Sequence, residues 1–247
     1  MRRRLRYVVL ALCVYGAVLL VTFPAWLARP YLERNLPHSV RIDDLHGSVW
    51  SGHLLLLFKT ANHREVFSRV YFGFRIRPPW PGRWGYALRF TGPLRGHVQV
   101  AFGPRSVHLS DLDVRAQATL VAWVPAVRGL GPRGALRLTA DRLILGAGLQ
   151  GQGQVTWRQA ALVSAPVSPL GSYVVRFGLE RGAIRYEIHT LSGRLQVAGH
   201  GRYAVATRVL SFTGDVFGHD LRLNRLVQNV GVADGHGGRI VSFKAPI

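Results

Sequence analysis

The pattern of apolar and polar residues changes near residue 28, and the two parts of the chain predict different structures. Residues 8–27 form an apolar run without a charged side chain. Four arginines come directly before this run: Arg2, Arg3, Arg4 and Arg6. A run of about 20 apolar residues matches the ~30 Å hydrocarbon core of a bilayer, and preceding cationic residues favour the cytoplasmic side. The pattern predicts a basic cytoplasmic tail at 1–7, a transmembrane anchor at 8–27 and a domain beyond the membrane at 28–247.

A cleaved signal peptide is the alternative interpretation of the same segment, because it also begins with a positive region and an apolar stretch. The small residues Ala25 and Ala28 lack the A-x-A spacing of a cleavage site, and Trp26 lies between them. Cys13 lies in the middle of the run and follows the bulky Leu12, which is unfavourable for a lipoprotein site. We therefore expect an uncleaved anchor.

Beyond the anchor, apolar and polar residues alternate with a period of two, which is typical of half-buried strands. In 66–77 the positions of Val70, Phe72 and Phe74 alternate with arginine, tyrosine and glycine, and Ser68 interrupts the apolar side. The same pattern predicts strands at 86–90, 97–102, 136–145, 173–179, 184–191, 194–199 and 239–244. Gly- and Pro-rich turns separate these segments, and short connections favour antiparallel pairing.

Two stretches show helical spacing instead. Residues 115–124 place Leu120, Val121 and Val124 on one helical face, and residues 221–230 do the same after Asp220 as a cap. A glycine also recurs just before alternating segments, at Gly47, Gly96, Gly134 and Gly193. The fold prediction is mainly β: an anchor helix, then a curved antiparallel sheet with one or two short helices. The alternation does not decide between an open sheet and a closed barrel.

Charge excludes some classes of function. The chain has a formal net charge of +20. Because four basic residues precede the anchor and no acid does, the outer domain carries 28 basic and 12 acidic residues. We do not expect nucleic-acid binding, since the predicted topology removes the domain from that compartment and the arginines are dispersed. The single cysteine lies in the anchor, so the outer domain is expected to fold without disulfides.

No catalytic, cofactor or metal site is predicted. Residues 146–151 match G-x-G-x-x-G, but a turn and a strand follow instead of the helix that a dinucleotide site needs. His46 with Asp43 and Asp44 is the nearest metal-like or acid–base cluster, and we interpret it as a solvated turn. Acids are scarce throughout, which disfavours hydrolysis by paired carboxylates.

An aromatic cluster is the best candidate for a partner surface. It follows a Pro-rich turn and contains Arg77, Trp80, Arg83 and Trp84. Trp, Tyr and Arg are enriched in binding hot spots. Core packing of the same rings is the alternative interpretation.

Four segments in order make the chain resemble the type II secretion system protein N family, which is also called general secretion pathway protein N. They are 45–52 (LHGSVWSG), 131–138 (GPRGALRL), 153–160 (GQVTWRQA) and 170–173 (LGSY). The motif residues are Gly47, Trp50, Gly52, Gly134, Gly153, Trp157, Gly171 and Tyr173, which we expect to be structural. The family has no known catalytic residues to carry over.

The resemblance implies a single-pass protein of the Gram-negative inner membrane with its bulk in the periplasm. It would be a non-enzymatic scaffold or adaptor in type II protein secretion, whose sheet edges offer a place for strand addition. The implied partners are other inner-membrane secretion components and, as a further candidate, the outer-membrane secretin. The alternative is a periplasmic lipid-handling or envelope-assembly protein with a β-trough, which the apolar run 54–58 favours.

Overall fold

The computed structural model describes most of the chain beyond the predicted anchor. The described residues are 23–35, 40–59, 65–76, 84–103, 105–123, 129–146, 148–180, 182–219, 223, 232–233 and 239–246. Within these ranges no helix has the length and apolar character needed to cross a membrane. Residues 1–22, which hold most of the predicted anchor, lie outside them.

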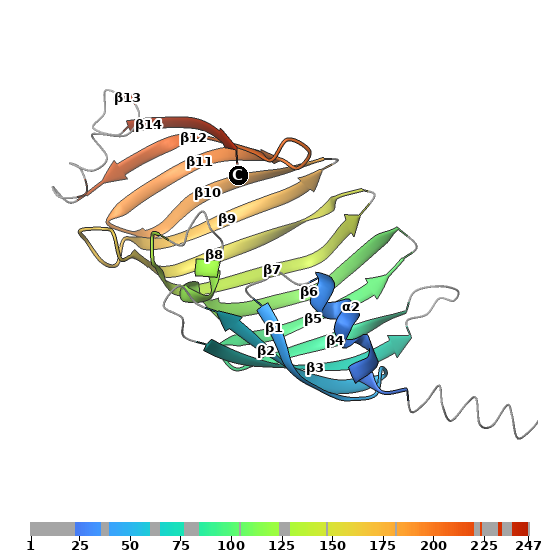
Figure 1. Ribbon diagram of the computed structural model, residues 1–247. Coiled ribbons are helices and arrows are strands. Elements are labelled where there is room, and N and C mark those ends of the chain that lie inside the picture. Colours follow the sequence, from blue (N-terminus) through green and yellow to red (C-terminus); the bar gives the residue numbers. More distant parts are fainter. Residues whose placement is uncertain are drawn as a thin grey trace, which may run out of the picture.

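A single antiparallel sheet dominates the structure, as the alternating pattern predicts (Figure 1). Its strands are β1 (Val40–Gly47), β2 (Ser51–Lys59), β3 (Glu65–Ile76), β4 (Trp84–Thr91), β5 (Leu94–Phe102), β6 (Ser106–Gln117), β7 (Pro132–Gly146), β8 (Gln150–Leu162), β9 (Gly171–Glu180), β10 (Ala183–Gly193), β11 (Leu195–Ala204), β12 (Val209–Gly218), β13 (Val232–Ala233) and β14 (Arg239–Pro246). Their order in space follows the chain, except that β14 pairs with β12 and β13 lies outside β14. The sheet is therefore built from consecutive hairpins, with β1 at one edge and β13 at the other.

The two faces of the sheet differ in the way that the alternation predicts. On β3, Val70 is buried and Phe72 and Phe74 are half-buried, whereas Arg69 and Tyr71 on the other face are exposed. Ser68 interrupts the apolar side. It is buried, and its hydroxyl is satisfied there because it accepts a hydrogen bond of 3.1 Å from the backbone N–H of Leu94. We call the apolar side the concave face and the polar side the convex face.

The first six strands curl around their concave face. The short 3₁₀ helix η2 (Ala118–Trp123) follows β6, packs on β7, and also lies against β2. Because three strands separate β2 from β6 in the sheet, one short helix reaches both only if this part of the sheet bends strongly. In Figure 1 the first strands turn under the rest of the sheet. We call β1–β6 the N-terminal half and β7–β14 the C-terminal half.

The helix predicted at 115–124 is wrong over its first residues. Residues Arg115, Ala116 and Gln117 pair with β7 as the end of β6, and the helical part among the described residues of this range is Ala118–Trp123, one 3₁₀ segment. Continued pairing with a long neighbouring strand satisfies more backbone groups than a short isolated helix would, so tertiary pairing overrides the local spacing. The helix predicted at 221–230 lies outside the described residues except for Leu223, which is helical and buried.

The recurring glycines have a common backbone conformation. Gly47, Gly96, Gly134 and Gly193 all adopt positive φ, between 102° and 140°. At Gly134 an added Cβ would lie 2.6 Å from the carbonyl oxygens of Arg158 and Gln159 on β8. Glycine is needed there both for the backbone conformation and for the close approach of the neighbouring strand.

Candidate functional site: an apolar groove

The chain enters the sheet through a short segment that packs on β1. Pro24 forms an isolated bridge with Ser48, and the carbonyl of Phe23 accepts a 2.9 Å hydrogen bond from the N–H of Val49. A 3₁₀ turn, η1 (Ala25–Ala28), and helix α2 (Arg29–Asn35) follow. Ala25 is buried against Ile42 and Leu45. Residues 23–27 of the predicted anchor segment thus contact the folded domain.

An apolar groove of about 420 Å³ lies on the concave face of the N-terminal half. Its lining residues are Ala25, Ile42, Leu45, Val49, Leu54, Leu56, Val70, Phe72, Tyr86, Leu88, Phe90, Val100 and Phe102. The phenol of Tyr86 is the only side chain in this set with a polar atom. The volume falls within the range of roughly 300–1,000 Å³ that small-molecule sites occupy.

Cross-strand register explains how these side chains meet. Leu54 of β2 lies opposite Val70 of β3, and Phe72 lies opposite Leu88 of β4. Since side chains alternate between faces, these pairs and their neighbours two residues away share the concave side. The run 54–58 divides accordingly: Leu54 and Leu56 line the groove, and Leu57 is buried on the other face.

Aromatic rings form a ladder across one end of the groove. Trp50 contacts Phe74 edge-to-face with ring centroids 4.8 Å apart, and Phe74 contacts Tyr86 at 5.6 Å. Tyr86 in turn contacts Phe102 at 6.3 Å. The Tyr86 phenol is neutral at physiological pH, and burial raises its pKa further above the ordinary value. The ladder therefore presents apolar ring surface without a formal charge.

The mouth of the groove is marked by exposed rings. Trp84 lies opposite Phe102 in the register of β4 and β5, on the same side as Tyr86. Trp84 is 63% exposed and Phe102 is 48% exposed. The sequence predicted Trp84 as part of a partner surface, and the structure places it at the lip of this groove. Arg77, Trp80 and Arg83, the other predicted members of that surface, lie outside the described residues.

The predicted family-motif residues fall into two groups. Gly47, Trp50 and Gly52 lie at the β1–β2 hairpin, where the ring of Phe72 covers Gly52. Trp157 and Tyr173 lie on neighbouring strands of the C-terminal half, with ring centroids 6.4 Å apart. The hydrophobic cluster around this second pair contains Ala160, Val167, Leu170, Tyr173 and Leu223.

Hydrogen bonds fix the second group in place. The indole N–H of Trp157 donates to the carbonyl of Arg133 at 2.9 Å, and the Tyr173 hydroxyl donates to the carbonyl of Leu195 at 2.9 Å. Burial raises the pKa of Tyr173 to about 12. Gly171 packs against β10, because an added Cβ would lie 2.6 Å from the carbonyl oxygen of Ser192. These contacts give Trp157, Gly171 and Tyr173 a packing role.

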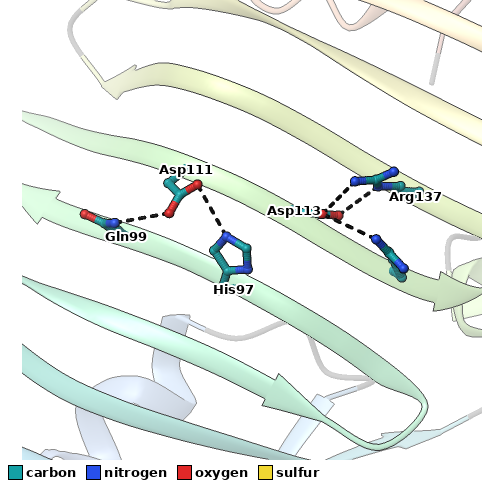
Figure 2. A network of polar contacts seen from close by, with 6 residues as sticks. His97, Gln99, Asp111, Asp113 and Arg137 are labelled. Atoms are coloured by element: carbon teal, nitrogen blue, oxygen red, sulfur yellow. Dashed lines mark hydrogen bonds and ion pairs between the residues drawn. The ribbon is translucent and has the colours of Figure 1, made fainter.

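A polar network on the convex face of β5, β6 and β7 was not anticipated from the sequence (Figure 2). Arg137 donates two hydrogen bonds to the carboxylate of Asp113, at 3.0 and 2.8 Å. Asp111 accepts a 3.2 Å hydrogen bond from Gln99 and lies 3.3 Å from the His97 ring nitrogen. The hydrogen bond from Arg137 is the main cause that lowers the pKa of Asp113, so this carboxylate is ionised and paired.

This network joins strands and does not form a reactive centre. The side chains of His97 and Asp111 are about half exposed to solvent. In the part of the chain that the structure describes, no three His, Cys, Asp or Glu side chains are grouped to hold a metal ion. His46 and Asp44, the metal-like pair of the sequence, form a similar exposed contact of 2.9 Å.

A second hollow, of about 710 Å³, has different chemistry. It lies over β7–β11 and includes the exposed side chains of Asp141, Arg176, Arg185, Glu187 and His200. Charges of both signs alternate here in full contact with water, which weakens their interactions with each other and with a ligand. The apolar groove is therefore the better candidate site.

The fold and groove define a class of protein: an extended antiparallel β-sheet with an apolar groove on its concave face. The family model for type II secretion system (T2SS) protein N matches residues 38–241. The chain belongs to this family and is an accessory component of type II secretion. Comparison with curated proteins and with solved structures gives no match.

Proposed function

We propose that this protein is a single-pass component of the inner membrane, with its sheet in the periplasm, that serves type II secretion as a non-enzymatic scaffold or adaptor. The apolar groove is the observation that carries this proposal. Its lining residues are apolar except for the phenol of Tyr86. Such a lining suits the binding of an apolar surface and not acid–base or nucleophilic chemistry.

Contact through exposed side chains beside the groove, such as Trp84, supports this role better than strand addition at a sheet edge. On β1, the bulge between Ile42 and Asp44 interrupts the ladder, and the Arg29 guanidinium donates to the Ile42 carbonyl at 3.0 Å. On the other side, β14 carries Lys244 and Pro246. Bulges, lysines and prolines are the features by which proteins protect sheet edges from further pairing. Other inner-membrane secretion components, and the secretin, are the partners we propose.

A gene deletion tests the function. Exoproteins retained in the periplasm with an intact outer membrane support the secretion role. Normal secretion together with detergent sensitivity of the outer membrane contradicts it, and supports lipid handling or envelope assembly as the second candidate. The continuous apolar concave face is the observation that favours this second candidate, because such a surface can shield acyl chains from water.

The Trp84→Ala variant tests the partner surface. Because this ring is largely exposed, its removal should leave the fold intact and lower the yield of secretion components in a pull-down. The ring of Phe67 on β3 is also exposed but lies on the convex face of the sheet, so Phe67→Ala is the matched control. Equal yields from the Trp84→Ala variant and the unaltered protein would exclude Trp84 from the contact.

A further inference from the structure

We propose that the apolar groove holds an acyl chain of an anionic phospholipid from the membrane in which the protein is anchored. The chain would enter between Trp84 and Phe102, at the end of the groove next to Phe23. This inference rests on the membrane anchoring given above as part of the proposed function. It does not require that the protein move lipid from one membrane to another.

The chemistry of the lining favours a hydrocarbon chain. The floor of the groove is the interior of the sheet, where the backbone groups of β2–β5 pair with neighbouring strands. An extended peptide would bring its own backbone donors and acceptors into this surface and leave them unpaired. Burying such a group without a partner is unfavourable, because its lost hydrogen bonds to water are not replaced. An alkyl chain has no polar group to satisfy and gains from every apolar contact.

The two ends of the curled strands β2–β6 differ. Helix η2 lies where β6 ends and also reaches β2, so it covers one end of the curled strands. Its residues Ala118 and Leu120 are buried. The opposite end carries the β1–β2 and β5–β6 turns and the ring ladder, and the chain arrives there through Phe23. We call this end the hairpin edge.

The hairpin edge has the composition of a surface that rests on a membrane. Apolar side chains are exposed where the chain enters, with Phe23 at 45%, Trp26 at 61% and Leu27 at 42%. Trp84 and Phe102 extend this exposed apolar surface to the mouth of the groove. Aromatic side chains prefer the interface between headgroups and hydrocarbon.

Charge at the same edge favours an anionic lipid. Arg75, at the end of β3, and Arg105, in the β5–β6 turn, are exposed. The sequences of the turns at this edge, 48–50 and 103–105, contain no acid. Basic side chains near a membrane surface are attracted by anionic headgroups. Together, the groove lining and the chemistry of its edge define one ligand: an apolar tail with a negative head.

Photolabelling of the full-length protein in vesicles tests this site. The probe is phosphatidylglycerol with a diazirine near the end of one acyl chain, and labelled peptides are located by mass spectrometry. We expect label on concave-face residues of β3–β5 in addition to the anchor. The same photoreactive chain on phosphatidylcholine should give at least threefold less label in these strands. Label confined to 8–27 would overturn the proposal. It would do so also if residues 8–22 filled the groove in place of a lipid chain.

A matched pair of variants on one strand separates the groove from the rest of the sheet. Val100→Trp fills the groove, whereas Gln99→Trp places the same ring on the opposite face of β5. We expect Val100→Trp to lower labelling of β3–β5 at least fivefold and Gln99→Trp to leave it unchanged. Equal labelling of the two variants contradicts the site. Leu88→Trp and Ala87→Trp on β4 provide a second pair if Val100→Trp does not fold.

Flotation with the vesicles distinguishes this proposal from the anchoring on which it rests. A protein that floats but carries no label in β3–β5 overturns the acyl-chain site and leaves the proposed function standing. A protein that fails to float contradicts the anchoring and, with it, the route by which a membrane lipid would enter.

Discussion

The two halves of the sheet build the same apolar concave face and fill it differently. In the C-terminal half, rings lie over glycines of neighbouring strands. Tyr186 covers Gly201, and its hydroxyl donates to the carbonyl of Ser211 at 3.0 Å. Phe177 covers Gly153 in the same way, with its ring 2.5 Å from where a Cβ would be. The protein's own side chains therefore occupy the surface there.

In the N-terminal half the rings line a void instead. Of its rings, Phe72 covers Gly52, whereas Phe74, Tyr86 and Phe102 contact one another and leave the groove beside them. Leu54, Leu88 and Val100 form the floor and walls. The comparison shows that an apolar sheet face leaves a groove where its rings contact one another instead of lying over glycines of the neighbouring strand.

The largest expected difference between the halves comes from removing a tryptophan from each. Trp157→Ala should lower the free energy of unfolding by about 3–4 kcal/mol, because the ring packs in a hydrophobic cluster and its N–H is bonded. Trp50→Ala should cost less, about 1–2 kcal/mol, since both rings are half-buried but Trp50 stands at a hairpin and Trp157 packs against a buried cluster. Denaturant unfolding followed by circular dichroism measures both. Normal stability with lost secretion would instead identify either residue as a contact residue.

Adding one methyl group tests the ring-over-glycine packing. Gly201→Ala should destabilise the protein by about 2–3 kcal/mol, because the new Cβ meets both the Tyr186 ring and the carbonyl of Ser211. Gly178→Ala is the matched control on the convex face, where a Cβ meets nothing within 4 Å, and should change stability by less than about 0.5 kcal/mol. Equal thermal unfolding midpoints for the Gly201→Ala and Gly178→Ala variants would show that the rings are not fixed over the glycines.

Enlarging a valine should have opposite effects in the two halves. Val175→Phe, between Val155 and Ile188, should cost about 1–2 kcal/mol through overpacking. Val100→Phe adds the same ring to the groove and should be neutral or stabilise by up to about 1 kcal/mol, as cavity-filling substitutions do. Similar losses from both variants in denaturant unfolding would mean that the groove closes when the protein is free of ligand.

The smallest expected effect comes from the hydroxyl of Tyr173. Tyr173→Phe removes the hydrogen bond to the Leu195 carbonyl and should cost about 1 kcal/mol at pH 8. Because burial raises the folded pKa from 10.0 to about 12, the unfolded chain loses this proton first as pH rises. The stabilising effect is present in full below pH 10 and is lost between pH 10 and 12. The difference in the free energy of unfolding between the unaltered protein and the variant should shrink over that range. A difference that does not change with pH would exclude this linkage.

The period-two alternation of apolar and polar residues was the most reliable basis for predicting the fold. It located β3, β7, β9 and β10 to within a few residues, because each places branched or aromatic residues on one face over a long stretch. It did not predict β6, whose convex side holds Asp111 and Asp113, or the exact end of that strand. A bulge near Asp111, where φ is 54°, shifts the register and breaks the period of two.

The sequence by itself determined an antiparallel sheet with one apolar and one polar face, and it predicted a turn and a strand at the glycine-rich run 146–151. It also determined the family, through segments that the family model spans. Only the tertiary structure decided that β1–β5 enclose a groove while β8–β12 are covered by their own rings. The physical reason is that strand curvature and cross-strand register decide which ring meets which glycine, and both depend on residues far apart in the chain.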